Sequence, residues 1–204
     1  MGKFEKFSIT IIFGAVMPVF LFLAGWWGSI GRISENLISV AALAGLASGV
    51  MVDILFFKKW LRNVYHTDMK MLMIIYLFYS ICIFGFFMGV PVFNLLAGIV
   101  AGMFAGRKLY YDNASINKVK SNIKRLCSFT SAVMLAICLA SAYFALKDPG
   151  DTARNLEGMF NIEKFSINTG MVVGIIVIGG FALIIFQYWL TKKAAIIAYN
   201  KVKS

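Results

Sequence analysis

The stretch Phe84–Asn94, FGFFMGVPVFN, decides whether a long apolar region of this chain forms one helix or two. The region runs from 71 to 106 and contains no charged residue. Glycine is a poor residue for a helix interior, and proline lacks the N–H that the helix needs. Gly85, Gly89 and Pro91 therefore predict a break, with one helix over 71–90 and a second over 91–106.

The composition places this hairpin in a membrane protein. The chain has 204 residues, of which 60% are apolar and 14% charged, and its mean hydropathy is +0.81. Apolar runs of about 20 residues, each long enough to cross the hydrocarbon core, recur along the chain. We predict an all-α bundle of six transmembrane helices, forming one domain over 1–204. The expected spans are 8–28, 36–57, 71–90, 91–106, 126–146 and 169–190.

Basic residues set the expected orientation. With the break in place, most of the 20 Lys and Arg fall on one side of the membrane. They lie at the N-terminus, after spans two and four, and at the C-terminus. Because cytoplasmic segments are enriched in Lys and Arg, we predict a protein of the cytoplasmic membrane with both termini on the cytoplasmic side. The net charge of +11 is therefore explained by basic residues that set the orientation and contact anionic lipid of the inner leaflet. Nucleic acid is not expected as a partner.

Two connecting segments attract attention. Around 114–125, Ile116, Val119, Ile123 and Leu126 recur at helical spacing among lysines, which predicts an amphipathic helix. This helix would lie on the anionic leaflet or dock a cytoplasmic partner. On the other side, the loop 147–168 is long for so compact a protein. Its part 147–165 is either a lid over a pocket or a solvated connector.

Small residues repeat every four positions on two spans. Ala41, Gly45 and Gly49 do so on span two, and Gly98, Gly102 and Gly106 on span four. Faces of this kind let helices approach closely in lipid. We expect the two spans to pack against each other or against a partner helix.

Asp53 continues the small-residue face of span two near the inner boundary. A carboxylate close to hydrocarbon is costly, and Arg107 follows Gly106 at the same expected depth. A structural ion pair of Asp53 with Arg107, or with Lys58 or Lys59, is the favoured interpretation, and Arg107 is the preferred partner. A cation- or proton-linked site at Asp53 is the alternative.

Binding residues are sought on the outer side, where Trp26, Trp27, Arg32 and Asn94 are expected at one level. Together they suggest an outward-facing pocket. The sequence shows no catalytic motif and no set of metal ligands, since the three cysteines lack CxxC spacing and the single histidine has no paired ligand. No catalytic residue, metal or cofactor is therefore assigned.

The segments GLASGVMVDILFF (45–57) and FNLLAGIVAGMFAGRK (93–108) resemble parts of the substrate-binding S-components of energy-coupling-factor vitamin transporters. Those proteins also have six helices with both ends inside, and a glycine-rich second helix that ends in Asp. The resemblance implies a non-catalytic solute-binding subunit that works with a membrane coupling subunit and an ATPase.

Two other functions remain open from the sequence. The chain could be a structural or assembly subunit, as a homo-oligomer or with other helices, that packs through the glycine faces of spans two and four. Less favoured is a lipid-modifying enzyme, with Asp53 as its acid or base and the basic surface gathering anionic headgroups.

Overall fold

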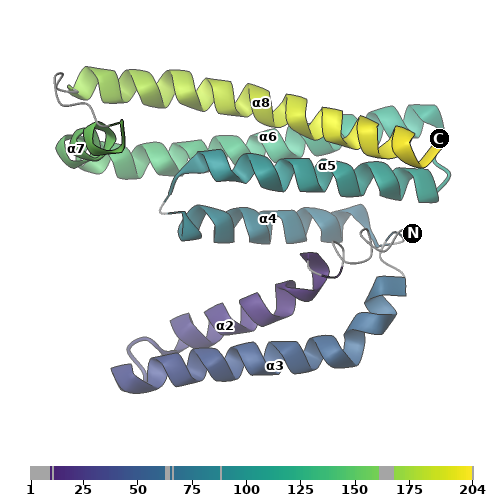
Figure 1. Cartoon of the computed structure of the whole chain (residues 1–204), viewed down its shortest axis with the longest axis horizontal. Coiled ribbons are helices and arrows are strands. Elements are labelled where there is room, and N and C mark those ends of the chain that lie inside the picture. Colours follow the sequence, from purple (N-terminus) through teal and green to yellow (C-terminus); the bar gives the residue numbers. More distant parts are fainter. Residues whose placement is uncertain are drawn as a thin grey trace. The chain divides into compact units, whose positions relative to one another are not determined.

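The computed structural model describes residues 10, 12–62, 65, 67–87, 89–160 and 168–203, and every regular element in these ranges is a helix (Figure 1). Six of the helices in the described ranges are long and apolar enough to cross a membrane. The predicted all-α, six-span architecture is therefore confirmed, and the chain is a multi-pass membrane protein. The inside position of both termini stays a prediction. The start of the span expected over 8–28 and residues 161–167 of the loop expected over 147–168 lie outside the described ranges.

The chain divides into two compact units, Met1–Thr67 and Asp68–Ser204. Each unit is described by itself, and the single domain expected over 1–204 stays a prediction. Among the described residues, the first unit contains two membrane-crossing helices. The second contains the other four, together with one short α-helix and one 3-10 turn.

The first unit is an antiparallel pair of helices, α2 (Val16–Ser29) and α3 (Glu35–Arg62). A turn with Gly31 at φ +73° joins them. Glycines make the contact close: a Cβ on Gly25 would lie 2.6 Å from the Ala41 carbonyl oxygen, and one on Gly49 would lie 2.5 Å from the Pro18 Cα. The small-residue face of span two is thus occupied by α2.

The predicted break in the apolar region is present. Helix α4 (Met69–Phe86) ends just before Gly89, whose φ of +83° favours glycine. A single 3-10 turn, η2 (Pro91–Phe93), then leads into α5 (Asn94–Tyr111). Phe87 and Phe93 stack across this turn with ring centroids 3.7 Å apart. The chain therefore reverses direction within a few residues, as the glycines and the proline require.

The glycine face of α5 packs against α8 (Thr169–Lys203) along the bundle (Figure 1). A Cβ on Gly102 would collide with the Thr191 carbonyl oxygen, and one on Gly106 with that of Ala195. Spans two and four were expected to pack against each other or against a partner helix; within each unit the neighbour of the small-residue face is α2 for span two and α8 for span four. The close approach of backbones that the spacing predicted does occur, with different neighbours.

Helix α6 (Ile116–Lys147) is one continuous helix of 32 residues. The expected amphipathic helix over 114–125 is its first part, because no glycine or proline separates it from the following span. Ile116 at the start of this face is 69% exposed, and contact of the segment with a leaflet or a partner stays a prediction. Val119, Ile123 and Leu126 are buried, and the first two share a core cluster with Leu109 of α5 and Ala195 of α8. The bundle thus covers most of this apolar face.

The expected loop over 147–168 contains a short helix, α7 (Pro149–Phe160), which contacts α6 and α8 (Figure 1). Asp148 caps its start by accepting a hydrogen bond from the Asp151 N–H, 3.0 Å away. Ala153 is buried. This part of the segment is therefore an ordered helix seated on the bundle, and whether it acts as a lid stays open.

Candidate functional site

Six polar side chains lie buried together in the second unit, within an otherwise apolar bundle. They come from four helices: α4 contributes two, α5 and α6 one each, and α8 two. Every one is at most 6% exposed. The set, called the polar cluster below, consists of Tyr76, Ser80, Asn94, Thr130, Gln187 and Thr191.

Gln187 is at the centre of the hydrogen bonds in this cluster. Its Nε2 donates to the Tyr76 hydroxyl at 3.3 Å and to the Thr191 Oγ1 at 3.4 Å. Thr130 Oγ1 donates to the Cys127 carbonyl at 3.1 Å and lies 3.4 Å from Thr191 Oγ1, with which it shares a second hydroxyl contact. Most of these bonds are longer than the 2.7–3.2 Å usual for proteins. Hydrogen bonds thus link the cluster, but most of them are long and therefore weak.

Two amide oxygens in the cluster have no donor. Asn94 Nδ2 donates to the Ser80 carbonyl at 3.3 Å, but Asn94 Oδ1 accepts no hydrogen bond from the described part of the chain. The same holds for Gln187 Oε1. Both residues are fully buried. An unsatisfied buried acceptor costs about 1–3 kcal/mol, and the described part of the chain places no donor on either oxygen.

Gly98 provides the space for Gln187. A Cβ at Gly98 would overlap the Gln187 Nε2 and lie 2.8 Å from the Thr191 Oγ1. Asn94 precedes Gly98 by one helical turn on α5, so both belong to the same face. The glycine lets the amide of α8 lie against the α5 backbone, and this brings the two helices and their polar groups together.

The cluster lies within helices that are long and apolar enough to cross a membrane. The Thr169–Gln187 part of α8 is about 27 Å long, and Gln187 precedes Lys192 by about 7.5 Å. Asn94 is the first residue of α5, so this helix begins alongside the middle of α8 and not at its start.

The proposed outer pocket is not brought together as a set within either unit. Trp26, Trp27 and Arg32 belong to the first unit, where Trp27 is 71% exposed and Arg32 donates to the Gly28 carbonyl at 3.4 Å. Asn94 belongs to the second unit and is fully buried. A pocket that combines all four residues stays a prediction. What the structure adds is that Asn94 has polar neighbours of its own.

The predicted pair of Asp53 and Arg107 is divided in the same way. Asp53 lies on α3 in the first unit and Arg107 on α5 in the second. Their ion pair stays a prediction. Among the described residues, no three His, Cys, Asp or Glu side chains gather where they could hold a metal ion.

Sequence reasoning found Asn94 and Gly98 but missed Gln187, Thr130 and Thr191. Gln187 had a signal, because an amide inside an apolar run is unusual and often functional. The two threonines gave no such signal in the sequence, because Ser and Thr are common in membrane helices. Their grouping depends on contacts between positions 61 residues apart in the chain.

The chain was also compared with known proteins. No protein-family model matches it, and neither the curated proteins nor the solved structures give a match.

Proposed function

We propose that this protein is a solute-binding or transport subunit of the cell membrane, and that the polar cluster is its binding site. The observation that carries the proposal is the pair of buried amide oxygens, Asn94 Oδ1 and Gln187 Oε1, that lack donors in the described chain. A solute with N–H or O–H groups would satisfy both. The sequence-based expectation of a non-catalytic subunit agrees with this assignment.

The chemistry of the cluster favours a neutral solute. Its side chains are hydroxyls and amides, and none of the six carries a charge. A charged solute in a low-dielectric site needs an opposite charge or a full shell of ligands. We therefore propose a small polar molecule that donates hydrogen bonds, such as a polyol or an amide. Energy for transport would come from a membrane coupling subunit and an ATPase.

The assembly alternative has less support. It relied on glycine faces that hold helices of other subunits, and both faces are covered within this chain by α2 and α8. The enzyme alternative relied on Asp53, which lies outside the polar cluster.

Thermal unfolding of the purified protein in neutral detergent tests the proposal. The probes are neutral polyols and amides, with sodium and potassium chloride for comparison. A ligand at 100 times its Kd adds about 2.7 kcal/mol of stability, so binding raises the Tm. We expect at least one neutral probe to raise the Tm of the native protein, and the double variant Asn94→Leu/Gln187→Met to lose that shift.

Ser48→Ala is the matched control. Ser48 is exposed on α3, and its hydroxyl donates to the Ala44 carbonyl of its own helix at 2.8 Å, so this variant should keep the shift. The proposal is wrong if no neutral probe stabilises the native protein, or if the double variant responds as the native protein does. Stabilisation by the salts alone would replace the neutral solute with a cation.

A further inference from the structure

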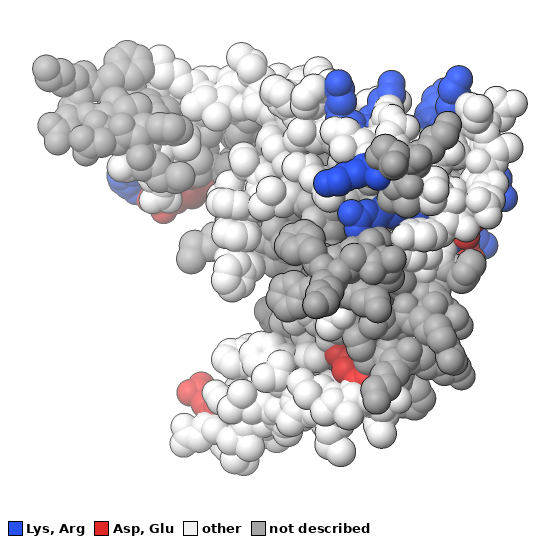
Figure 2. Space-filling model, turned by 45° about the vertical axis from the view of Figure 1, so that its right-hand side comes forward, with Lys and Arg blue, Asp and Glu red and all other residues white. Residues whose placement is uncertain are grey.

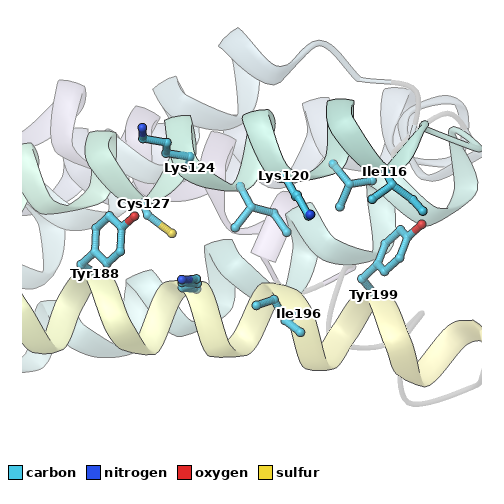
Figure 3. Close-up of a pocket in the computed structure, with 10 residues that line it drawn as sticks. Ile116, Lys120, Lys124, Cys127, Tyr188, Ile196 and Tyr199 are labelled. Carbon is cyan, nitrogen blue, oxygen red and sulfur yellow. The ribbon is translucent and has the colours of Figure 1, made fainter.

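A groove runs between the first part of α6 and the last part of α8 (Figure 3). It adjoins the polar cluster, because Cys127 lines the groove and its carbonyl accepts the hydrogen bond from Thr130. The volume of the groove is about 450 Å³. Figure 3 shows Lys120 of α6 reaching toward α8, and Tyr199 of α8 reaching toward Ile116. The groove is thus built by residues from two helices that pack together.

The interior of the groove is apolar. Val119 and Ile123 of α6 form its floor with Cys127, and all three are buried. Ile196 lines the α8 side and is partly exposed, at 39%. A floor of this kind accepts hydrocarbon and offers little to a strongly hydrated ligand.

The charges around the groove all have one sign. Lys120, Lys124 and Lys192 line it, and no acidic residue does. In the described part of the chain none of these three lysines forms a salt bridge, whereas the nearby Lys108 pairs with Asp112 at 2.8 Å. Lys124 extends to the side of α6 away from α8 (Figure 3). Lys120 and Lys192 are therefore the two cations best placed to bind an anion above the apolar floor.

The groove lies at the end of the membrane-crossing segments. Lys and Arg side chains gather at this end of the second unit, which carries the C-terminus (Figure 2). The neighbouring Trp189 lies under the Lys193 ammonium, 5.6 Å from the ring centroid. Tryptophan and lysine are typical of the headgroup region. The groove is thus placed where phosphate groups and the first part of the acyl chains meet.

We propose that this groove binds one anionic phospholipid. Its phosphate is held by Lys120 and Lys192, and the glycerol end of its acyl chains lies on the floor formed by Val119 and Ile123. Charge complementarity selects an anionic headgroup, and the apolar floor selects a ligand with a hydrocarbon part. Binding would tie α6 to α8 at the basic end of the unit.

The test uses the full chain in neutral detergent, titrated with dioleoyl phosphatidylglycerol, dioleoyl phosphatidylcholine or glycerol 3-phosphate. Native mass spectrometry counts the bound molecules, and tryptophan fluorescence gives the Kd. The groove variant is Lys120→Gln/Lys192→Gln. The control, Lys118→Gln/Arg125→Gln, removes two positive charges from the same end of α6 without changing a residue that lines the groove.

We expect one phosphatidylglycerol to bind in preference to phosphatidylcholine and to glycerol phosphate. A lysine near an anionic headgroup contributes about fivefold in affinity, so the groove variant should bind about 25-fold more weakly. The control variant should change the Kd much less. Equal losses in the two variants would show a diffuse surface in place of a groove. Equal binding of both lipids would also overturn the proposal, and so would glycerol phosphate binding as tightly as the lipid, since that would assign the groove to a soluble anion.

Discussion

The contact between Gly102 of α5 and α8 allows a sharp test of the bundle. In a Gly102→Ala variant the new Cβ would collide with the Thr191 carbonyl oxygen. It would also lie 3.1 Å from the Ala194 Cβ and 3.2 Å from the Ala195 nitrogen. Ordinary contacts between carbon atoms are about 3.5–4.0 Å. The obstacles are backbone atoms and a Cβ, which cannot rotate away, so the two helices must separate.

The expected cost follows from this geometry. Overpacking a well-packed contact costs about 1–3 kcal/mol. Alanine in place of glycine inside a helix contributes about 0.5–1 kcal/mol in the opposite direction. Gly179→Ala, also in a membrane-crossing helix, is the matched control because its Cβ would meet nothing within 4 Å. The propensity gain cancels between the two variants, so Gly102→Ala should be less stable than Gly179→Ala by about 1–3 kcal/mol.

Reversible unfolding in mixed micelles, followed by circular dichroism, measures this difference. The free energy of unfolding is compared among the native protein, Gly102→Ala and Gly179→Ala. If the two variants agree within about 0.5 kcal/mol, the usual range for substitutions that disturb nothing, then α5 and α8 are not in this close contact. The packing described for the second unit would then be incorrect.

Two further predictions concern other parts of the chain. In the first unit, Gly49→Ala should destabilise the α2–α3 pair by about 1–3 kcal/mol, because its Cβ would lie 2.5 Å from the Pro18 Cα. A Cβ at Gly28 meets open space, so Gly28→Ala should not destabilise the pair. The same unfolding assay compares the two variants, and equal stabilities would contradict the pairing. In α7, the Arg154 guanidinium beside Asp151 lowers the pKa of that carboxyl. The ion pair is therefore complete above the usual pKa of the carboxyl and is lost as the pH falls through the lowered value. Carbon NMR of the Asp151 carboxyl should show this lowered pKa, and Arg154→Gln should return it toward the usual range; an unchanged titration in that variant would refute the pairing.

Local features of the chain were sufficient to predict the number of helices and the hairpin between α4 and α5. Hydropathy measures how favourably a segment moves from water into lipid, and it is summed over neighbouring residues. The effects of Gly89 and Pro91 are local as well, because they act on the backbone of the residues beside them. The four-residue spacing of Gly98 and Gly102 likewise identified a surface that allows close approach.

The tertiary structure alone decided which helix uses each surface. A row of glycines is complementary to any smooth helix, so the sequence could not distinguish α8 from α3 as the neighbour of Gly102. For the same reason the apolar face that begins α6 looked as suited to a lipid leaflet as to the core it occupies with Leu109 and Ala195. The polar cluster depends most on long-range contacts. Asn94 and Gln187 become a candidate site only because Gly98 lets α5 and α8 approach closely, and no local pattern records that approach.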